Sequence, residues 1–139
     1  MKYGCFILLC LLRTVLPGFG QTAATPSPAV CDVRAFGAVS DGTTVNTKSL
    51  QDAIDKCNAA GGGTVLVAGG RYVTGTLYLK SNVNLRVEAG AAILGSPNIV
   101  DYTTDTDRTM YRGEPYMNRC LIFAKDAQNI GIDGEGTID

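Results

Sequence analysis

Carboxylates are the side chains of this sequence that offer acid–base chemistry, and they are scattered over turns and strand ends. Hydrolysis of a glycosidic bond needs two carboxyl groups facing one cleft, roughly 6.5–9.5 Å apart for inversion or about 5–5.5 Å for retention. Glu88 and Asp133 occupy the same position of a sequence repeat, so stacked repeats would bring such side chains onto one face. A polar turn explains that position more simply, and we assign it no catalytic role. The other carboxylates considered are Asp32, Asp41, Glu135 and Asp139.

The sequence offers few residues for metal binding, nucleophilic catalysis or phosphate binding. The 139 residues include no histidine, which excludes a His-based metal site, a catalytic triad and an imidazole base from this chain. Asp101, Asp105 and Asp107 have a calcium-like spacing, but the glycine and distal glutamate of a calcium loop are missing. The glycine runs lack the Lys-Ser/Thr ending of a phosphate-binding loop. The sequence therefore predicts no catalytic, substrate-binding or metal-ligating residue in this chain, and no cofactor.

The elements that would position such residues follow from a repeat between Gly62 and Gly95 and a later third copy. Apolar residues two apart, followed by a glycine bend, are typical of short strands stacked as coils of a solenoid. A shift of twenty residues superimposes Val65 on Leu85, Val67 on Val87, Gly70 on Gly90, Val73 on Ile93 and Gly75 on Gly95. A shift of forty-five superimposes Leu85 on Ile130, Val87 on Ile132, Ile93 on Ile138, Asn84 on Asn129, Leu77 on Ile122 and Lys80 on Lys125.

This periodicity predicts an all-β solenoid, the first coils of a right-handed parallel β-helix. No single copy can bury its apolar face alone, whereas stacked copies form one continuous core. A meander of antiparallel hairpins also alternates, but hairpins do not require a constant shift between successive pairs. We therefore favour the β-helix.

One amphipathic helix precedes the first coil. Asn46 is expected to cap it by accepting a first-turn amide, and the glycines of Ala60–Gly63 end it. Ahead of it, Val33–Phe36 is predicted to be extended and Ser40–Thr43 to be a turn. A solenoid leaves an open apolar end, so we expect this helix to cap the first coil. Its apolar face consists of Leu50, Ala53, Ile54 and Cys57.

The N-terminus resembles a secretory signal peptide, which we place at residues 1–24. Lys2 supplies the positive start and Cys5 to Leu12 the apolar core, although Arg13 interrupts the pattern. An uncleaved anchor or a mis-assigned start codon are the alternatives. Residues 25–30 then read as a linker and residues 31–139 as the folded domain. The prediction is a secreted or extracytoplasmic protein, extracellular or periplasmic, without membrane attachment after cleavage.

Three cysteines follow the predicted signal peptide: Cys31, Cys57 and Cys120. In an oxidising compartment one pair could form a disulfide, and Cys31 and Cys57 are the nearest in sequence. An equally good interpretation is that all three are small buried apolar residues. No CxxC spacing indicates a metal site.

The segment from Pro97 to Arg119 is polar and departs from the repeat. It predicts a long excursion from the stack, and long loops on rigid scaffolds are often functional. Its tyrosines, Tyr102, Tyr111 and Tyr116, could stack against sugar rings, but we favour a solvated loop packed by its own aromatic residues. The net charge is −1 and no basic face is evident, so nucleic acid is not an expected partner.

Several stretches resemble glycoside hydrolase family 28, the polygalacturonase group of the pectate-lyase-like β-helix superfamily. The entry segment Asp32–Ala38, with Asp41–Thr43, Leu50–Ile54 and Gly61–Val65, is similar to that of pectin-degrading β-helix enzymes, and Tyr72–Leu85 and Asn129–Asp139 sharpen the match. The resemblance covers most of residues 31–139 and implies a secreted hydrolase, monomeric at full length. Its substrate would be pectin or polygalacturonate, α-linked galacturonate chains that it cleaves with inversion.

The family's catalytic motifs are absent from this sequence. The resemblance implies an Asn-Thr-Asp, an Asp-Asp, a Gly-His-Gly and an Arg-Ile-Lys motif, all after the Gly-Thr-Ile-Asp coil that ends at Asp139. Asn46-Thr47-Lys48 is no substitute, because its third residue is a lysine at the start of the helix. We therefore transfer no catalytic residue and interpret the chain as an N-terminal fragment, inactive alone. With no cap on its last coil, residues 25–139 alone are expected to fold poorly.

Two other functions fit the same sequence. One is a pectate lyase or another β-helix carbohydrate-active enzyme, which would carry acidic calcium ligands and a basic proton acceptor on later coils. The other is a non-catalytic β-helix module for polysaccharide binding or surface structure.

Overall fold

The computed structural model describes residues 28–106 and 118–139. The predicted signal peptide, Asp107, Tyr111 and Tyr116 lie outside these ranges. Thirteen elements follow in the described part: β1 (Ala29–Asp32), η1 (Val33–Phe36), β2 (Asp41–Val45), α1 (Thr47–Ala59), β3 (Gly63–Val67), β4 (Gly70–Thr74), β5 (Leu77–Leu79), β6 (Val83–Val87), β7 (Ala91–Gly95), η2 (Ile99–Asp101), β8 (Ile122–Ala124), β9 (Gly131–Gly134) and β10 (Thr137–Ile138).

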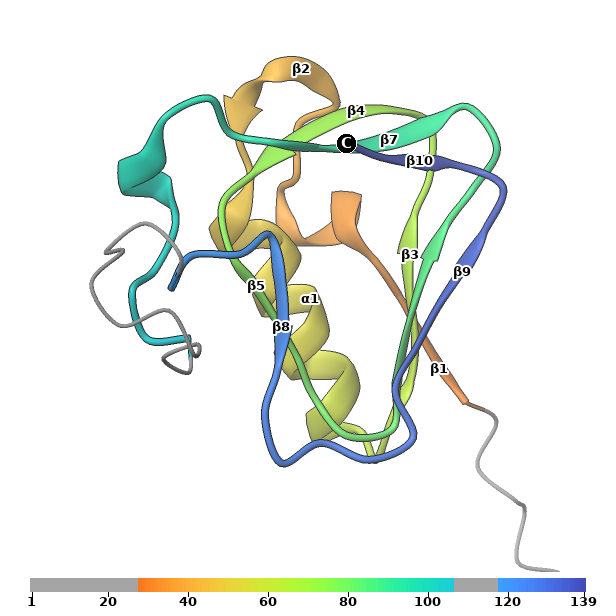
Figure 1. Cartoon of the computed structure of the whole chain (residues 1–139). Coiled ribbons are helices and arrows are strands. Elements are labelled where there is room, and N and C mark those ends of the chain that lie inside the picture. Colours follow the sequence, from red (N-terminus) through yellow and green to blue (C-terminus); the bar gives the residue numbers. More distant parts are fainter. Residues whose placement is uncertain (1–27, 107–117) are drawn as a thin grey trace, which may run out of the picture.

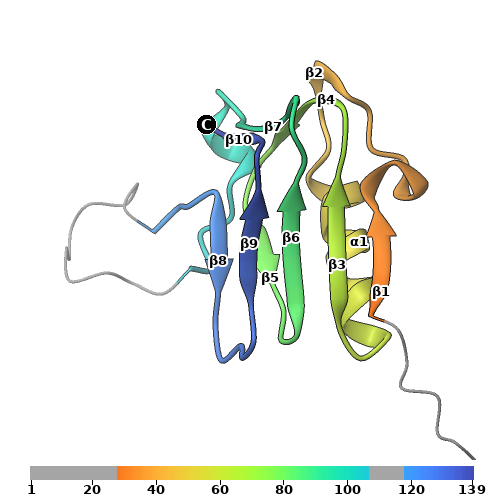
Figure 2. The same ribbon diagram turned by 90° about the vertical axis from the view of Figure 1, so that its right-hand side faces the viewer.

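The strands form three parallel sheets wound around one core, as a β-helix requires. Their orders are β1-β3-β6-β9, β10-β7-β4-β2 and β5-β8, and every described strand pair is parallel. Figure 1 looks along the stack, with the three sheets as the sides of a triangle, and Figure 2 shows β1, β3, β6 and β9 side by side. This confirms the predicted β-helix with its single capping helix and excludes the antiparallel meander.

The turn between the first and second sheets differs in length by one residue between the first two coils. Val65 pairs with Leu85, as the shift of twenty predicts. In the next sheet Tyr72, not Val73, pairs with Ile93, so the predicted match of Val73 with Ile93 is wrong. Gly70 likewise lies opposite Ala91, and Thr74, rather than Gly75, lies opposite Gly95. The cause is a connection of two residues between β3 and β4 but of three residues between β6 and β7.

The third coil keeps the predicted shift of forty-five in two of its three sheets. Leu77 pairs with Ile122 and Ile93 with Ile138. Leu85, however, pairs with Ile132 and not with Ile130, and Asn84 lies opposite Gly131 rather than Asn129. The connection from β8 to β9 (residues 125–130) is longer than that from β5 to β6 (residues 80–82), which displaces the register.

The hydrophobic core fills the interior of the β-helix, and its side chains are less buried in the last coil. Leu85 and Ile93 are fully buried, whereas their partners Ile132 and Ile138 are 49% and 40% exposed. An apolar side chain in a stack is covered by the coil on each side, so the last coil has only one such neighbour. The fully buried interior includes Val65, Val67, Tyr72, Leu77, Val83, Leu85 and Ile93.

Helix α1 covers the first coil with its predicted apolar face, since Leu50, Ala53, Ile54 and Cys57 are all buried. Asn46 stands at its N-cap position but makes no capping hydrogen bond, so the predicted role was wrong. Its Oδ1 accepts the Val39 N–H at 2.7 Å, and its Nδ2 donates to the carbonyls of Val39 and Thr44 at 2.9 and 2.7 Å. These backbone groups of the segment before the helix bind the buried Asn46 amide in place of the first turn of α1.

The polar side of α1 takes the place of a neighbouring strand at the edge of β5. The Gln51 amide accepts the Tyr78 N–H at 2.8 Å and donates to the Tyr78 carbonyl at 3.1 Å. One turn earlier, Thr47 Oγ1 accepts the Gly75 N–H at 2.7 Å, and near the helix end Asn58 donates to the Ser81 carbonyl at 2.9 Å. Backbone groups that a strand would otherwise pair are thus satisfied by one helix face.

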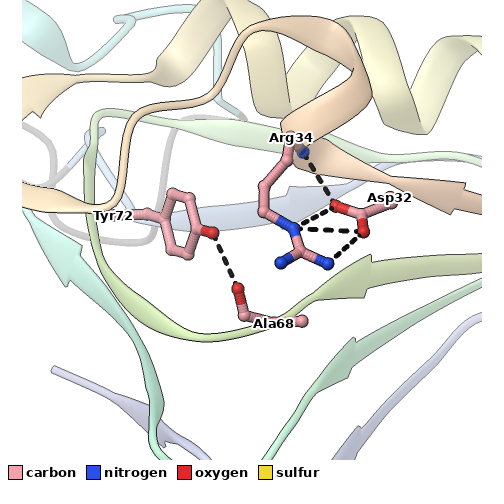
Figure 3. Close-up of polar contacts among 4 residues, drawn as sticks. All are labelled: Asp32, Arg34, Ala68 and Tyr72. Atoms are coloured by element: carbon pink, nitrogen blue, oxygen red, sulfur yellow. Dashed lines mark hydrogen bonds and ion pairs between the residues drawn. The ribbon is translucent and has the colours of Figure 1, made fainter.

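The segment between β1 and α1 differs from prediction. Val33–Phe36 is a short 3₁₀ helix, not an extended piece. Figure 3 shows the Arg34 guanidinium paired with Asp32 beside the Tyr72 hydroxyl, which donates to the Ala68 carbonyl at 2.8 Å. The Arg34 partner holds the pKa of Asp32 below its ordinary value. In the predicted turn, the Asp41 carboxylate accepts the Thr43 and Thr44 N–H groups within an irregular β2.

Candidate functional site on the outer face of the β5–β8 sheet

Two aromatic side chains stand on the outer face of the β5–β8 sheet. Tyr78 pairs in register with Phe123, and the alternation along β5 buries Leu77 and Leu79 while Tyr78 faces outward. The two rings meet edge to face, with centroids 5.7 Å apart and an interplanar angle of 89°. Both residues are half-buried, so each keeps some surface exposed to solvent.

Two lysines follow these rings at the same spacing. Lys80 and Lys125 each come two residues after an aromatic residue and are exposed. Lys80 Nζ lies 4.0 Å from the Asp55 carboxylate of α1, a loose pair that leaves the ammonium hydrated. We call Tyr78, Lys80, Phe123 and Lys125 the aromatic–lysine strip. It combines apolar ring surface with cations, which suits a sugar acid that offers a C–H face and a carboxylate.

The strip is held from both sides. Gln51 fixes the backbone of Tyr78 from α1, and the Tyr78 hydroxyl donates to Thr103 Oγ1 at 3.1 Å. Thr103 belongs to the excursion after β7, and its N–H donates to Thr76 Oγ1 at 3.3 Å. The Thr76 hydroxyl in turn donates to the Cys120 carbonyl at 2.6 Å, where the chain returns. Both described ends of the excursion are therefore anchored beside β5.

Within the described part of the excursion, Tyr102 does not face outward as a free sugar platform. Its hydroxyl donates to the Ser96 carbonyl at 2.9 Å, and the residue is half-buried. Burial, together with the charge of Asp101, raises the pKa of Tyr102. This agrees with a loop packed by its own aromatic residue.

A pocket of about 440 Å³ lies between the start of the excursion and the last coil. The Arg119 guanidinium in its wall donates to the carbonyls of Ile99 and Tyr102, so its donors are partly used by the backbone. Among its lining residues that the structure describes, Asp139 is the one carboxylate, so the two carboxyl groups that glycosidic hydrolysis needs do not meet there. Its other lining residues include Gly95, Ser96, Leu121 and Asp139.

The structure places Glu88 and Asp133, which the repeat had aligned, at different positions of successive coils. Asp133 lies opposite Arg86, 3.6 Å from its guanidinium, and accepts from Asn84 Nδ2 at 3.0 Å. Glu88 is an exposed residue of the turn after β6, and the corrected register gives it a different repeat position. No group of three or more His, Cys, Asp or Glu side chains suited to a metal occurs among the residues described.

Sequence reasoning did not single out the strip. The shift of forty-five had aligned Leu77 with Ile122 and Lys80 with Lys125, and Tyr78 and Phe123 fall on the same shift. The signal was therefore present, but only the parallel pairing shows that the two aromatic residues are neighbours on an outer face. Across residues 28–106 and 118–139, no helix has the length and apolar character needed to cross a membrane.

The stack of parallel coils places the chain among the pectate lyase-like β-helix proteins. A profile of the family described as "Rhamnogalacturonase A/epimerase, pectate lyase-like" matches residues 30–139, and the chain belongs to that family.

Relatives and a solved structure confirm the predicted resemblance to family 28. The exo-poly-alpha-D-galacturonosidase of Dickeya chrysanthemi is 43% identical over 130 residues, covering 85% of this chain and 20% of the relative. A probable polygalacturonase of Vitis vinifera is 34% identical over 112 residues, covering 75% and 23%. The family 28 exopolygalacturonase of Yersinia enterocolitica superimposes with a TM-score of 0.70 at 39% identity, covering 81% and 21%. The chain thus spans about a fifth of the length of these proteins.

Proposed function

We propose that this chain is the N-terminal part of a secreted polygalacturonase-type glycoside hydrolase that cleaves α-linked galacturonate chains with inversion. The observation that carries the proposal is the likeness of the same coils to an exo-poly-alpha-D-galacturonosidase in sequence and to a family 28 exopolygalacturonase in structure. The chain's own coils supply the capped start of the β-helix. The carboxylates for acid and base catalysis would come from further coils, so the chain alone is inactive.

Activity assays on polygalacturonate test this proposal. The longest product of the reading frame that contains these residues should release new reducing ends, and an NMR time course should show the inverted anomer first. The 139-residue chain in the same assay should release none. Reducing ends from the short chain would contradict the fragment interpretation, and an unsaturated product from the long one would show a lyase instead. N-terminal sequencing of secreted material should begin near residue 25.

We further propose that the aromatic–lysine strip contacts the galacturonate chain. Lys80→Ala removes one cation, and Tyr78→Ala removes half of the ring pair. Each variant should weaken the binding of an oligogalacturonate roughly three- to tenfold, in line with a partly exposed charge or stacking contact. Titration calorimetry at two salt concentrations measures these affinities. The loss of affinity caused by Lys80→Ala should be smaller at the higher salt concentration, because salt screens the charge.

Lys48→Ala is the matched control for the strip. Lys48 is an exposed lysine of α1, engaged with Asp52 and outside the strip. Its removal lowers the net charge by the same amount but should leave oligogalacturonate binding unchanged. Equal losses in Lys48→Ala and Lys80→Ala would show a general charge effect and no site on the strip.

A further inference from the structure

Two cysteine side chains lie in the same interior cluster at the capped end of the helix. Cys31 is 8% exposed and Cys57 is fully buried. Cys31 belongs to β1, where it pairs with Val65 of β3. Cys57 is part of the apolar face of α1 that packs against this coil.

The sulfur of Cys57 reaches β1 itself. Cys57 Sγ lies 3.7 Å from the carbonyl oxygen of Ala29, two residues before Cys31 on the same strand. Residues two apart on a strand face the same side, and Cys31 faces the core. Burial, followed by the interaction with the Cys31 thiol, raises the pKa of Cys57 to about 12.

Cys120 lies elsewhere. It follows the excursion, where its carbonyl accepts the Thr76 hydroxyl, and it is only half-buried. Its thiol interacts with Thr106, and burial raises its pKa. Among the described cysteines, all three are free thiols, and only Cys31 and Cys57 share one cluster.

We propose that Cys31 and Cys57 form a disulfide that fastens β1 to α1 when the protein meets a disulfide oxidant. Cys31, the more accessible of the two, attacks the oxidant RSSR as its thiolate, which forms a mixed disulfide and releases one RS⁻. Cys57 then loses its proton and attacks the Cys31 sulfur, releasing the second RS⁻. Two thiols are oxidised and one RSSR is reduced to two RSH, with the two thiol protons balancing the charge.

The bond would close the loop from β1 through η1, β2 and α1, which contains the whole N-terminal cap. Closing such a loop removes conformations from the unfolded chain and stabilises the folded one. The proposal does not depend on the catalytic function, because it concerns the covalent state of the cap alone.

Peptide mapping after oxidation tests the pairing, in the longest product of the reading frame that contains these residues. The chain is incubated with oxidised glutathione under native conditions and in concentrated urea, alkylated, and cut by trypsin without reduction. Cleavage after Arg34, Lys56 and Arg71 puts Cys31 and Cys57 on separate peptides, and cleavage after Arg13 separates Cys5 and Cys10 from both. The native sample should yield the Cys31–Cys57 link at least about tenfold more often than any link to Cys120, whereas urea should remove this preference.

Thermal unfolding of two variants, made in the longest product of the reading frame so that the last coil is covered, gives an independent measurement. The oxidised parent should melt roughly 10 °C above the reduced parent. Cys120→Ala should keep this difference and Cys31→Ala should abolish it. Equal link proportions in native and urea samples, dominant pairing with Cys120, or a difference that survives in Cys31→Ala would each overturn the proposal.

Discussion

A single amide can do the work of a missing strand, as Gln51 does at the edge of β5. Its side chain makes both hydrogen bonds that a neighbouring strand would make to Tyr78. Gln51 lies on the polar side of α1, outside the buried face of Leu50, Ala53, Ile54 and Cys57, where a side chain would ordinarily be solvated. Its partner is twenty-seven residues away, so the interaction depends on how α1 packs against the coil.

Replacing Gln51 tests this role. Gln51→Ala should lower the free energy of unfolding by about 1–3 kcal/mol, because it leaves the N–H and C=O of Tyr78 without partners. Gln51→Glu should also destabilise at pH 7, since a carboxylate cannot donate to the carbonyl, but it should recover below about pH 4 as the acid regains a donor. Urea unfolding at two pH values measures both effects. Gln128→Ala, at an exposed position, is the control, and an equal loss there would contradict the argument.

The Asp41 carboxylate in β2 should make the stability of the protein depend on pH in acid. Asp41 accepts the Thr44 hydroxyl, the Thr44 N–H and the Thr43 N–H, and these bonds hold its pKa well below the ordinary value. Because the pKa of Asp41 is lower in the folded than in the unfolded chain, its ionised carboxylate stabilises the folded protein at pH values above the unfolded pKa of about 3.9. This stabilisation is lost as the pH falls toward the folded pKa. Asp41→Asn should therefore lower the melting temperature at pH 7 and make it less sensitive to acid below about pH 4. An unchanged acid dependence would contradict this.

Among the strands, the lengths of the connecting turns set the register between coils, which the sequence repeat did not predict correctly. The strand pattern predicted which residues of β3 and β6 pair, but a one-residue difference in the following turn moved Tyr72, in place of Val73, opposite Ile93. Alternation fixes the face of each strand locally, whereas register between coils depends on turn length. The same principle explains why Ile132, and not Ile130, follows Leu85.

Asn46 provides an element-scale prediction, because it joins the 39–44 segment to α1. Asp and Asn are about equally good helix caps, but only Asn can donate to the carbonyls of Val39 and Thr44. Asn46→Asp and Asn46→Ala should both therefore destabilise by about 2 kcal/mol in chemical denaturation. If Asn46→Asp were as stable as the parent, the residue would act as an ordinary cap.

At the scale of the whole molecule, the two ends of the stack are unlike. The first coil is covered by α1, whereas β8, β9 and β10 are the outer strands of their sheets at the other end. Ile132 and Ile138 are exposed there beside unpaired strand edges. Such an edge readily pairs with another chain. In the proposed hydrolase the next coil would cover it, and the full-length protein would be a monomer.

The 139-residue chain should therefore self-associate as its concentration rises. Ile132→Lys combined with Ile138→Lys should weaken this association by putting charge on the open coil. Sedimentation velocity over a range of concentrations measures it, and Val30→Lys, at an exposed position of β1, is the control. A parent chain that stays monomeric and melts sharply would contradict both this prediction and the expectation that residues 25–139 fold poorly alone.

The parallel β-helix, the amphipathic cap and the family resemblance could be predicted from the amino-acid sequence alone. These depend on local alternation, helical spacing and contiguous motifs, which Val65, Val67 and the Leu50–Cys57 face already display. The folded structure was needed to find the coil registers, the roles of Gln51 and Asn46, the aromatic–lysine strip and the approach of Cys57 to β1. Apart from the contacts of Asn46, these features join residues far apart in the chain, and their meeting depends on turn lengths and helix packing that no local pattern records.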